Sequence, residues 1–329
     1  MSNYQVRRFG GSPMIPVREK FPIDPCIATM ASNYWDSSQA KYWTFTRAEL
    51  ATARNDLAKT NQALHAKHPL PDTRHLAIYL QNQLAKLAKR MSLRQQALAT
   101  AQVYMKRFFL RLEIRKTNPY LIMATAVYLA CKMEECPQHI RLMLGEAARQ
   151  WPELGITESS KIGECEFALI STLSSRLILH HPYRALSDLQ GTLGLTQEEI
   201  TLAHSMLNDS YATDLPLLYP PHVIAITAIY LAVVLRPAQA AGLAAHSSSA
   251  ASSPALSGPA AQKAFSSFGF RQDPNKMGKL IDWLAESKVE MESIVDATQE
   301  LISLYDCWET YSERACKEGI TKFMKDGAK

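Results

Sequence analysis

The sequence contains none of the short motifs that mark the common nucleotide-dependent and hydrolytic enzymes. It has no G-x-x-x-x-G-K-[ST] phosphate loop, no G-x-G-x-x-G turn, no H-E-x-x-H zinc pair and no G-x-S-x-G nucleophile turn. The H-R-D, D-F-G and A-P-E segments of protein kinases are absent as well. We therefore expect a binding protein with no catalytic residues, no cofactor and no metal.

Long hydrophobic runs and strand patterns are also scarce. No run reaches the roughly 18 uninterrupted apolar residues of a membrane-spanning helix, and residues 1–30 lack the apolar core of a secretory signal. Few stretches alternate apolar and polar residues, whereas Leu and Ala recur at spacings of three and four. These patterns predict a soluble intracellular protein of all-α fold, without membrane contact.

The cysteines form no recognisable framework. None of the six shows C-x-x-C spacing, so we expect reduced thiols. A metal site built from Cys131, Cys136, His139 and Cys165 is the alternative, although buried thiols on helices are the more frequent arrangement.

Strong net charge is missing too, but the charge is unevenly distributed. The chain carries +5 in total, and nine basic residues with a single acid lie between Lys86 and Lys116. The simplest interpretation is a solvated basic helix face, followed by a docking surface for an acidic protein segment and then by duplex DNA. We expect no direct contact with nucleic acid.

The sequence does contain an internal repeat. Residues 119–132 (PYLIMATAVYLACK) recur 102 positions later as residues 221–234 (PHVIAITAIYLAVV), with seven of fourteen positions identical. Each copy begins with proline, which suits the first turn of a helix, and is apolar almost all round, which requires burial. The repeat predicts two copies of one helical unit, each built round a buried central helix.

Helix signals around the two copies predict the domain organisation, which is two five-helix bundles with an additional N-terminal helix. Thr46 with Glu49, and Thr196 with Glu199, form capping boxes that mark two helix starts. The expected helices of the bundles are 73–90, 93–112, 119–135, 138–150 and 157–173, then 183–190, 197–212, 221–235, 275–285 and 288–308. The expected parts are a disordered tail at 1–30, an N-terminal helical extension at 31–72, a first repeat at 73–177, a second repeat at 178–308 with a flexible Ala- and Ser-rich insertion at 237–273, and a C-terminal tail at 309–329.

The two copies differ most at their last aligned position, where the first has Lys132 and the second Val234. A second charged site lies in the predicted helix at 157–173, which contains Glu164 and Glu166. Two residues correspond to about 200° of helix rotation, so these carboxylates cannot share a face. One of them is expected to point toward the edge of the core or a partner.

The two five-helix units, the central helix ending in ACKMEE and the glutamate of the fifth helix resemble the cyclin box family. Within that family the chain is most similar to the cyclin C group of the Mediator kinase module. The similar stretches are residues 33–38 (NYWDSS), 93–96 (LRQQ), 181–184 (HPYR) and 208–221 (NDSYATDLPLLYPP).

The resemblance implies a site on each repeat. Lys132 and Glu166 match the residues that hydrogen-bond the backbone of a bound kinase, and the residues implied beside them are Glu135, Trp35 and Trp43. In the second repeat, Asp209 resembles a groove residue, and His204 stands where a tryptophan would match. The substrate-docking patch of cell-cycle cyclins is not matched, because residues 76–80 read LAIYL and Gln83 takes the place of a tryptophan.

The resemblance also implies the function. A nuclear regulatory cyclin would bind and activate the cyclin-dependent kinase of the Mediator kinase module, together with the other subunits of that module, and regulate transcription by RNA polymerase II. The alternative is a transcription factor of the TFIIB type, whose two cyclin-like repeats hold DNA and polymerase. An inert helical scaffold is the third possibility, and it does not explain the contrast between Lys132 and Val234.

Overall fold

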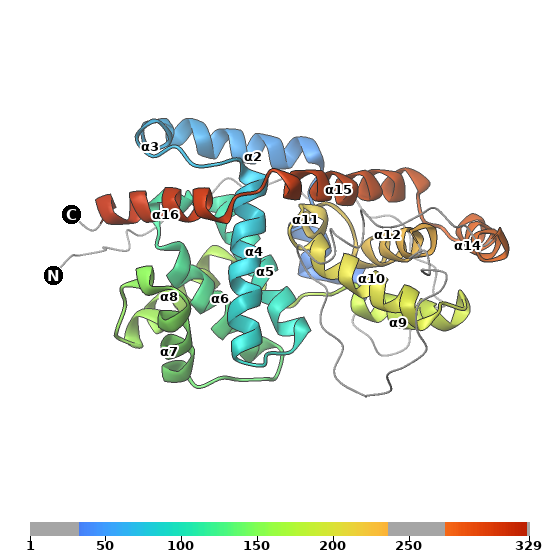
Figure 1. The fold of residues 1–329 in the computed structure, drawn as a ribbon, viewed down its shortest axis with the longest axis horizontal. Helices are drawn as coiled ribbons and strands as arrows, with labels where there is room; N and C mark the ends of the chain where they lie inside the picture. The colour runs from blue at the N-terminus through green and yellow to red at the C-terminus, as the bar shows by residue number, and fades with distance from the viewer. Residues whose placement is uncertain (1–32, 236–273, 328–329) are drawn as a thin grey trace, which may run out of the picture. The chain divides into compact units, whose positions relative to one another are not determined.

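The computed structural model describes residues 33–235 and 274–327 (Figure 1). Within these two ranges every regular element is a helix and none is a strand, which confirms the predicted all-α fold. No helix in the described ranges is long and apolar enough to cross a membrane. The tail predicted at 1–30 and the insertion predicted at 237–273 lie outside the described residues.

The chain divides into two compact units. The first comprises Met1–His180 and Ser312–Lys329, and the second comprises His181–Tyr311. All ten helices expected in the two bundles are present, and their ends lie within three residues of the predicted bounds. The chain therefore leaves the first unit at His180 and returns to it at Ser312.

The N-terminal extension consists of four short elements that belong to the first unit. They are η2 (Tyr34–Asp36), α1 (Ser38–Tyr42), α2 (Arg47–Thr60) and α3 (Gln62–Lys67). The side chain of Thr46 accepts a hydrogen bond from the Glu49 backbone N–H, and a Glu49 carboxylate oxygen lies 2.7 Å from the Thr46 nitrogen. This capping box confirms the predicted helix start, and α2 packs on a helix of the first bundle.

The first bundle surrounds one central helix. Its elements are α4 (Thr73–Arg90), α5 (Gln95–Arg111), η3 (Ile114–Lys116), α6 (Pro119–Met133), α7 (Ile140–Gln150), η4 (Pro152–Leu154) and α8 (Ser160–Thr172). Helix α6 begins at Pro119, and the Asn118 side chain caps it by accepting from the backbone N–H groups of residues 120 and 121. It packs against α4, α5, α7 and α8, and 11 of its 15 residues are buried.

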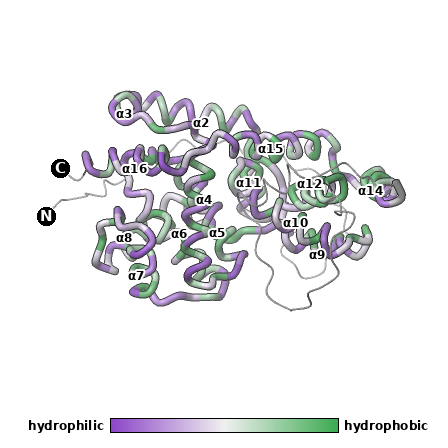
Figure 2. The backbone as a smooth tube through the Cα atoms, in the orientation of Figure 1, coloured by the Kyte–Doolittle hydropathy of each residue, from purple (hydrophilic) through white to green (hydrophobic). Residues whose placement is uncertain are grey.

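The second bundle repeats this plan. Its helices are α9 (Tyr183–Thr192), α10 (Gln197–Ser210), α11 (Leu215–Leu218), α12 (Pro221–Val234), α14 (Pro274–Glu286) and α15 (Met291–Glu309). Helix α12 packs against α9, α10, α14 and α15, and Figure 2 shows it mostly in the hydrophobic colour. The capping box of Thr196 and Glu199 is confirmed. The short helix α11 was not expected from the sequence.

The segment expected to be a C-terminal tail contains a long helix, α16 (Glu313–Gly327), which packs on α4 and η3 (Figure 1). Its residues Cys316, Ile320 and Phe323 are fully or almost fully buried. Because their spacing of four and three residues puts them on one helix face, α16 closes the apolar side of the first unit. The expectation of a tail was wrong. The sequence did not reveal a packed helix here because its apolar face is short and is surrounded by charged residues.

Candidate functional site

The two residues on which the sequence hypothesis depends, Lys132 and Glu166, lie side by side. Lys132 belongs to the last turn of α6 and Glu166 to the middle of α8, and these two helices pack together. The Lys132 Nζ donates a hydrogen bond of 2.7 Å to Glu166 Oε1. The side chain of Lys132 is 44% exposed and that of Glu166 is 13% exposed. The pair therefore reaches the surface at the edge of the bundle.

The two glutamates of α8 are separated as their spacing predicts. Glu164 is well exposed and forms an ion pair with Lys161, one helical turn earlier, at 2.9 Å. Glu166 lies on the other side of the helix and contacts α6. Only Glu166 is therefore placed to act together with Lys132.

Apolar side chains flank the charged pair. Phe167, which follows Glu166 in α8, is 77% exposed, and Met133, which follows Lys132 in α6, is 37% exposed. We call the four residues Lys132, Met133, Glu166 and Phe167 the α6–α8 surface. Aromatic and methionine side chains are enriched at protein interfaces. Phe167 and Met133 are not among the site residues predicted from the sequence, although each stands directly beside a predicted residue.

Glu135 lies just beyond the end of α6 and is exposed. Its φ is +50°, a left-handed conformation in which glycine is preferred. The Cys136 N–H donates to the Cys131 carbonyl at 2.9 Å, which closes the helix end in a Schellman arrangement. The side chain of Glu134, by contrast, accepts a hydrogen bond of 2.6 Å from the Thr100 hydroxyl.

The two N-terminal tryptophans have different surroundings. Trp35, in η2, is 52% exposed and has surface to offer to a partner. Trp43 is completely buried, with the Cζ atoms of Arg107 and Arg111 at 4.8 and 4.4 Å from its ring centroid. The structure contradicts a direct partner contact of Trp43, because its ring packs inside its own unit.

The residues implied for a groove in the second repeat are largely enclosed. Asp209 is fully buried and accepts a hydrogen bond of 3.1 Å from the Tyr305 hydroxyl. His204 is half-buried, its ring stacks on Tyr183 at 6.2 Å, and burial lowers its pKa. We therefore do not assign Asp209 to a partner surface in this structure.

The cysteines do not form a metal site in the part of the chain that the structure describes. No group of three or more His, Cys, Asp or Glu side chains there is arranged to hold an ion. Burial raises the pKa of Cys131 to about 12 and that of Cys165 to about 11. Both side chains are therefore neutral thiols at neutral pH.

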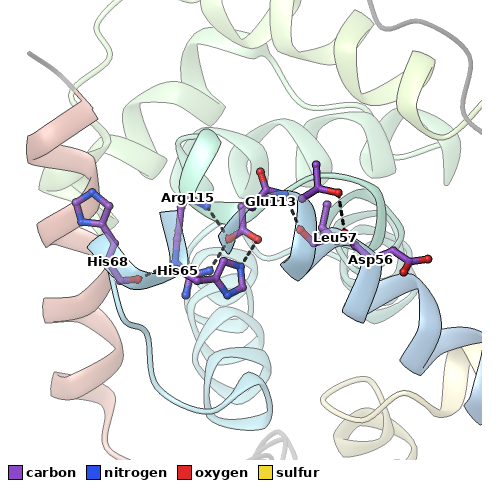
Figure 3. A network of polar contacts seen from close by, with 8 residues as sticks. Asp56, Leu57, His65, His68, Glu113 and Arg115 are labelled. Carbon is purple, nitrogen blue, oxygen red and sulfur yellow. Dashed lines mark hydrogen bonds and ion pairs between the residues drawn. The ribbon is translucent and has the colours of Figure 1, made fainter. Parts of the chain in front are cut away.

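The basic segment between Lys86 and Lys116 is not one solvated face. At least five of its nine basic side chains make intramolecular contacts, among them Lys86 with Glu313, Arg90 with Glu146, Arg107 and Arg111 with Trp43, and Arg115 with Glu113. Glu113 lies between Arg115 and His65 (Figure 3), and its carboxylate oxygens are 2.5 Å from Arg115 Nη1 and 2.9 Å from His65 Nε2. Burial would raise the pKa of Glu113, but the hydrogen bonds from His65 and Arg115 outweigh it and lower that pKa.

Comparison with known proteins agrees with this architecture. Residues 42–178 match the family model described as "Cyclin, N-terminal domain". A chain of the CAK complex from Chaetomium thermophilum, solved with ATP-gamma-S, has a similar fold, with a TM-score of 0.61 at 18% identity over 90% of this chain and 87% of that one. The chain therefore has a cyclin fold, with a cyclin N-terminal domain at residues 42–178.

Relatives that align over almost their whole length show the family to which the chain belongs. The "RNA polymerase II holoenzyme cyclin-like subunit" of Aspergillus oryzae is 53% identical over 298 residues, which cover 90% of this chain and 98% of the relative. The protein of the same name in Neurospora crassa is 48% identical, again over 90% of this chain and 98% of the relative. The chain belongs to the family of RNA polymerase II holoenzyme cyclin-like subunits.

Proposed function

We propose that this chain is the cyclin of the Mediator kinase module, a member of the cyclin C group. It binds and activates the cyclin-dependent kinase of that module in the nucleus, together with the other module subunits, and so regulates transcription by RNA polymerase II. Family membership supports the link to the polymerase, and the stretches similar to cyclin C support the link to Mediator. The chain itself is a regulatory subunit and not an enzyme.

The α6–α8 surface is the observation that supports kinase binding. Its ammonium group can donate to a backbone carbonyl of a partner, and its carboxylate can accept from a backbone N–H. In the free protein the two groups satisfy one another at 2.7 Å. The exposed Phe167 and Met133 beside them provide apolar area that a partner would cover.

The energetics of activation fit a surface of this kind. A ligand that moves a kinase from mostly inactive to mostly active must bind the active form more tightly by about 5 kcal/mol. In most interfaces a few central residues supply binding energy of that order. Lys132, Glu166 and Phe167 are the proposed central residues, with Trp35 and Glu135 as additional contacts.

The TFIIB-like alternative has less support. DNA binding by the segment between Lys86 and Lys116 needs free cationic side chains that can neutralise phosphates. At least five of those nine side chains are engaged within the first unit. A salt-sensitive DNA complex that maps to this segment would restore the alternative.

The test is to purify the chain with the module kinase and to replace Lys132 and Glu166 by alanine, singly and together. We expect circular dichroism to show unchanged helical content, while complex formation and kinase activity fall together. Full activity of the double variant would remove the α6–α8 surface as the kinase-binding site.

A further inference from the structure

Three arginines of the first unit lie against the rings of two consecutive residues, Tyr42 and Trp43. Arg107 and Arg111, one turn apart on α5, place their Cζ atoms 4.8 and 4.4 Å from the centroid of the Trp43 ring. Arg176, just beyond the end of α8, places its Cζ 3.4 Å from the centroid of the Tyr42 ring. We call Arg107, Arg111 and Arg176 the arginine cluster.

No carboxylate balances this charge among the residues that the structure describes. The polar contacts of the cluster go to neutral oxygens: Arg107 Nη1 donates to the carbonyl of Arg176 at 3.3 Å, and Arg111 Nη1 donates to the Thr172 carbonyl at 2.7 Å and the Ser174 hydroxyl at 3.0 Å. Thr172 ends α8, and a helix C-terminus contributes about half a negative charge. Most of the three positive charges are therefore uncompensated.

Arg107 has the least compensated charge of the three arginines. Its side chain is fully buried, and its Nε and Nη2 atoms have no hydrogen-bond partner. Burial lowers its pKa to about 9, so the guanidinium is still charged at neutral pH. A buried charged donor without an acceptor is costly. Arg115, the other strongly buried arginine of this unit, has the carboxylate of Glu113 at 2.5 Å.

The cluster lies at the C-terminal end of the helix that carries Glu166. Thr172 follows Glu166 by six residues, which is about 9 Å along a helix axis at 1.5 Å per residue. Arg111 and Arg176 are partly exposed, and Tyr42 is 41% exposed. A polypeptide that covers the α6–α8 surface can therefore extend along α8 to the cluster.

We propose that the arginine cluster is an oxyanion-binding site, which takes a carboxylate or phosphate group of the polypeptide that docks on the α6–α8 surface. Guanidinium groups bind such oxyanions through paired N–H donors. The identity of this polypeptide as the kinase rests on the proposed function, whereas the oxyanion chemistry does not.

The first test uses inorganic phosphate as the probe, without the kinase. Phosphate should raise the melting temperature of the wild-type chain by several degrees above sodium chloride of equal ionic strength. The R176Q variant should lose most of this increment, and R111Q serves the same purpose if R176Q alters helical content. R184Q is the matched control, because Arg184 is a highly exposed arginine of the second unit. Equal effects of phosphate and chloride, or equal responses of R176Q and the wild type, overturn the proposal.

A second test identifies the source of the oxyanion and separates this site from the proposed function. Short peptides with one phosphoserine, or with glutamate at that position, are titrated against wild-type chain and R176Q. At least tenfold weaker binding to R176Q in either series supports the site and names the group, and no difference in both series overturns it. If R176Q responds to phosphate and binds both peptide series as the wild type does, but K132A still disrupts the kinase complex, the oxyanion site is wrong and the proposed function stands. If phosphate binds but no kinase complex forms, the proposed function is wrong and the site stands.

Discussion

Exchanging the two charges of the α6–α8 surface separates a structural role of the ion pair from a role in binding. In the K132E/E166K double variant, the two side chains can still pair within the chain, because the wild-type atoms are only 2.7 Å apart. A partially exposed ion pair contributes about 0.2–1 kcal/mol. A carboxylate at the C-terminal end of α6 costs a further ~0.3–1 kcal/mol through the helix dipole. The stability of the double variant should therefore fall by no more than about 2 kcal/mol, even if the exchanged pair contributes nothing.

The effect on binding should be much larger. After the exchange, residue 132 cannot donate to a carbonyl of the partner, and residue 166 cannot accept from its N–H. Each charged hydrogen bond is worth about 1.5–3 kcal/mol, and each 1.4 kcal/mol changes the Kd about tenfold. Losing both predicts a Kd for the kinase that rises by at least about 100-fold, while the free energy of unfolding falls by no more than about 2 kcal/mol.

Biolayer interferometry with immobilised kinase gives the Kd, and urea unfolding followed by circular dichroism gives the stability. The control is the K161E/E164K exchange on the same helix, where the wild-type pair is also an exposed ion pair at 2.9 Å. That variant should bind within about twofold of wild type. Wild-type affinity of K132E/E166K would refute the reasoning, because it would show that Lys132 and Glu166 only hold α6 and α8 together.

Three other predictions concern the first unit. Phe323→Ala should lower the free energy of unfolding by about 3–5 kcal/mol, since this ring lies on the buried face of α16. The exposed Lys322→Ala on the same helix should change it by less than about 0.5 kcal/mol in the same urea titration. Glu135→Gly should raise stability by about 0.5–1 kcal/mol, because glycine relieves the cost of the positive φ, and a simultaneous loss of kinase affinity would show that the Glu135 side chain contacts the partner. The lowered pKa of Glu113 means that its contribution to stability is complete above the ordinary Glu pKa of about 4.3 and is lost as the pH falls through the folded pKa. Glu113→Gln should therefore destabilise the protein most near neutral pH and should flatten the acid limb of a plot of unfolding free energy against pH. An acid limb parallel to that of the wild type would contradict this.

Much of the bundle could be predicted because its signals are local. A proline at the start and an almost wholly apolar sequence predict helices α6 and α12. The capping boxes at Thr46 and Thr196 predict the first residue of two further helices. Helix α16 shows the limit of such signals. Its burial depends on an apolar face of the first unit that its own sequence does not reveal.

The site residues divide in the same way. Lys132 was detectable because the repeat supplies an internal comparison, in which charge replaces an apolar residue. Trp35 and Trp43 were not separable, since both are tryptophans in one aromatic stretch. Only the fold shows that α5 brings two arginines onto Trp43 and leaves Trp35 outside.

The duplicated architecture explains why the functional difference lies at the end of the central helix. In α6, 11 of 15 residues are buried, and in α12, 12 of 14 are buried. A charged side chain inside either helix would be buried at a high cost in stability, so the interiors of the two copies have little freedom to carry charge. The last turn has more, because a long side chain there can reach solvent. The first repeat uses this position for Lys132, whereas the second closes its core with the buried Val234. For this reason only the first repeat can present a charged pair at this position.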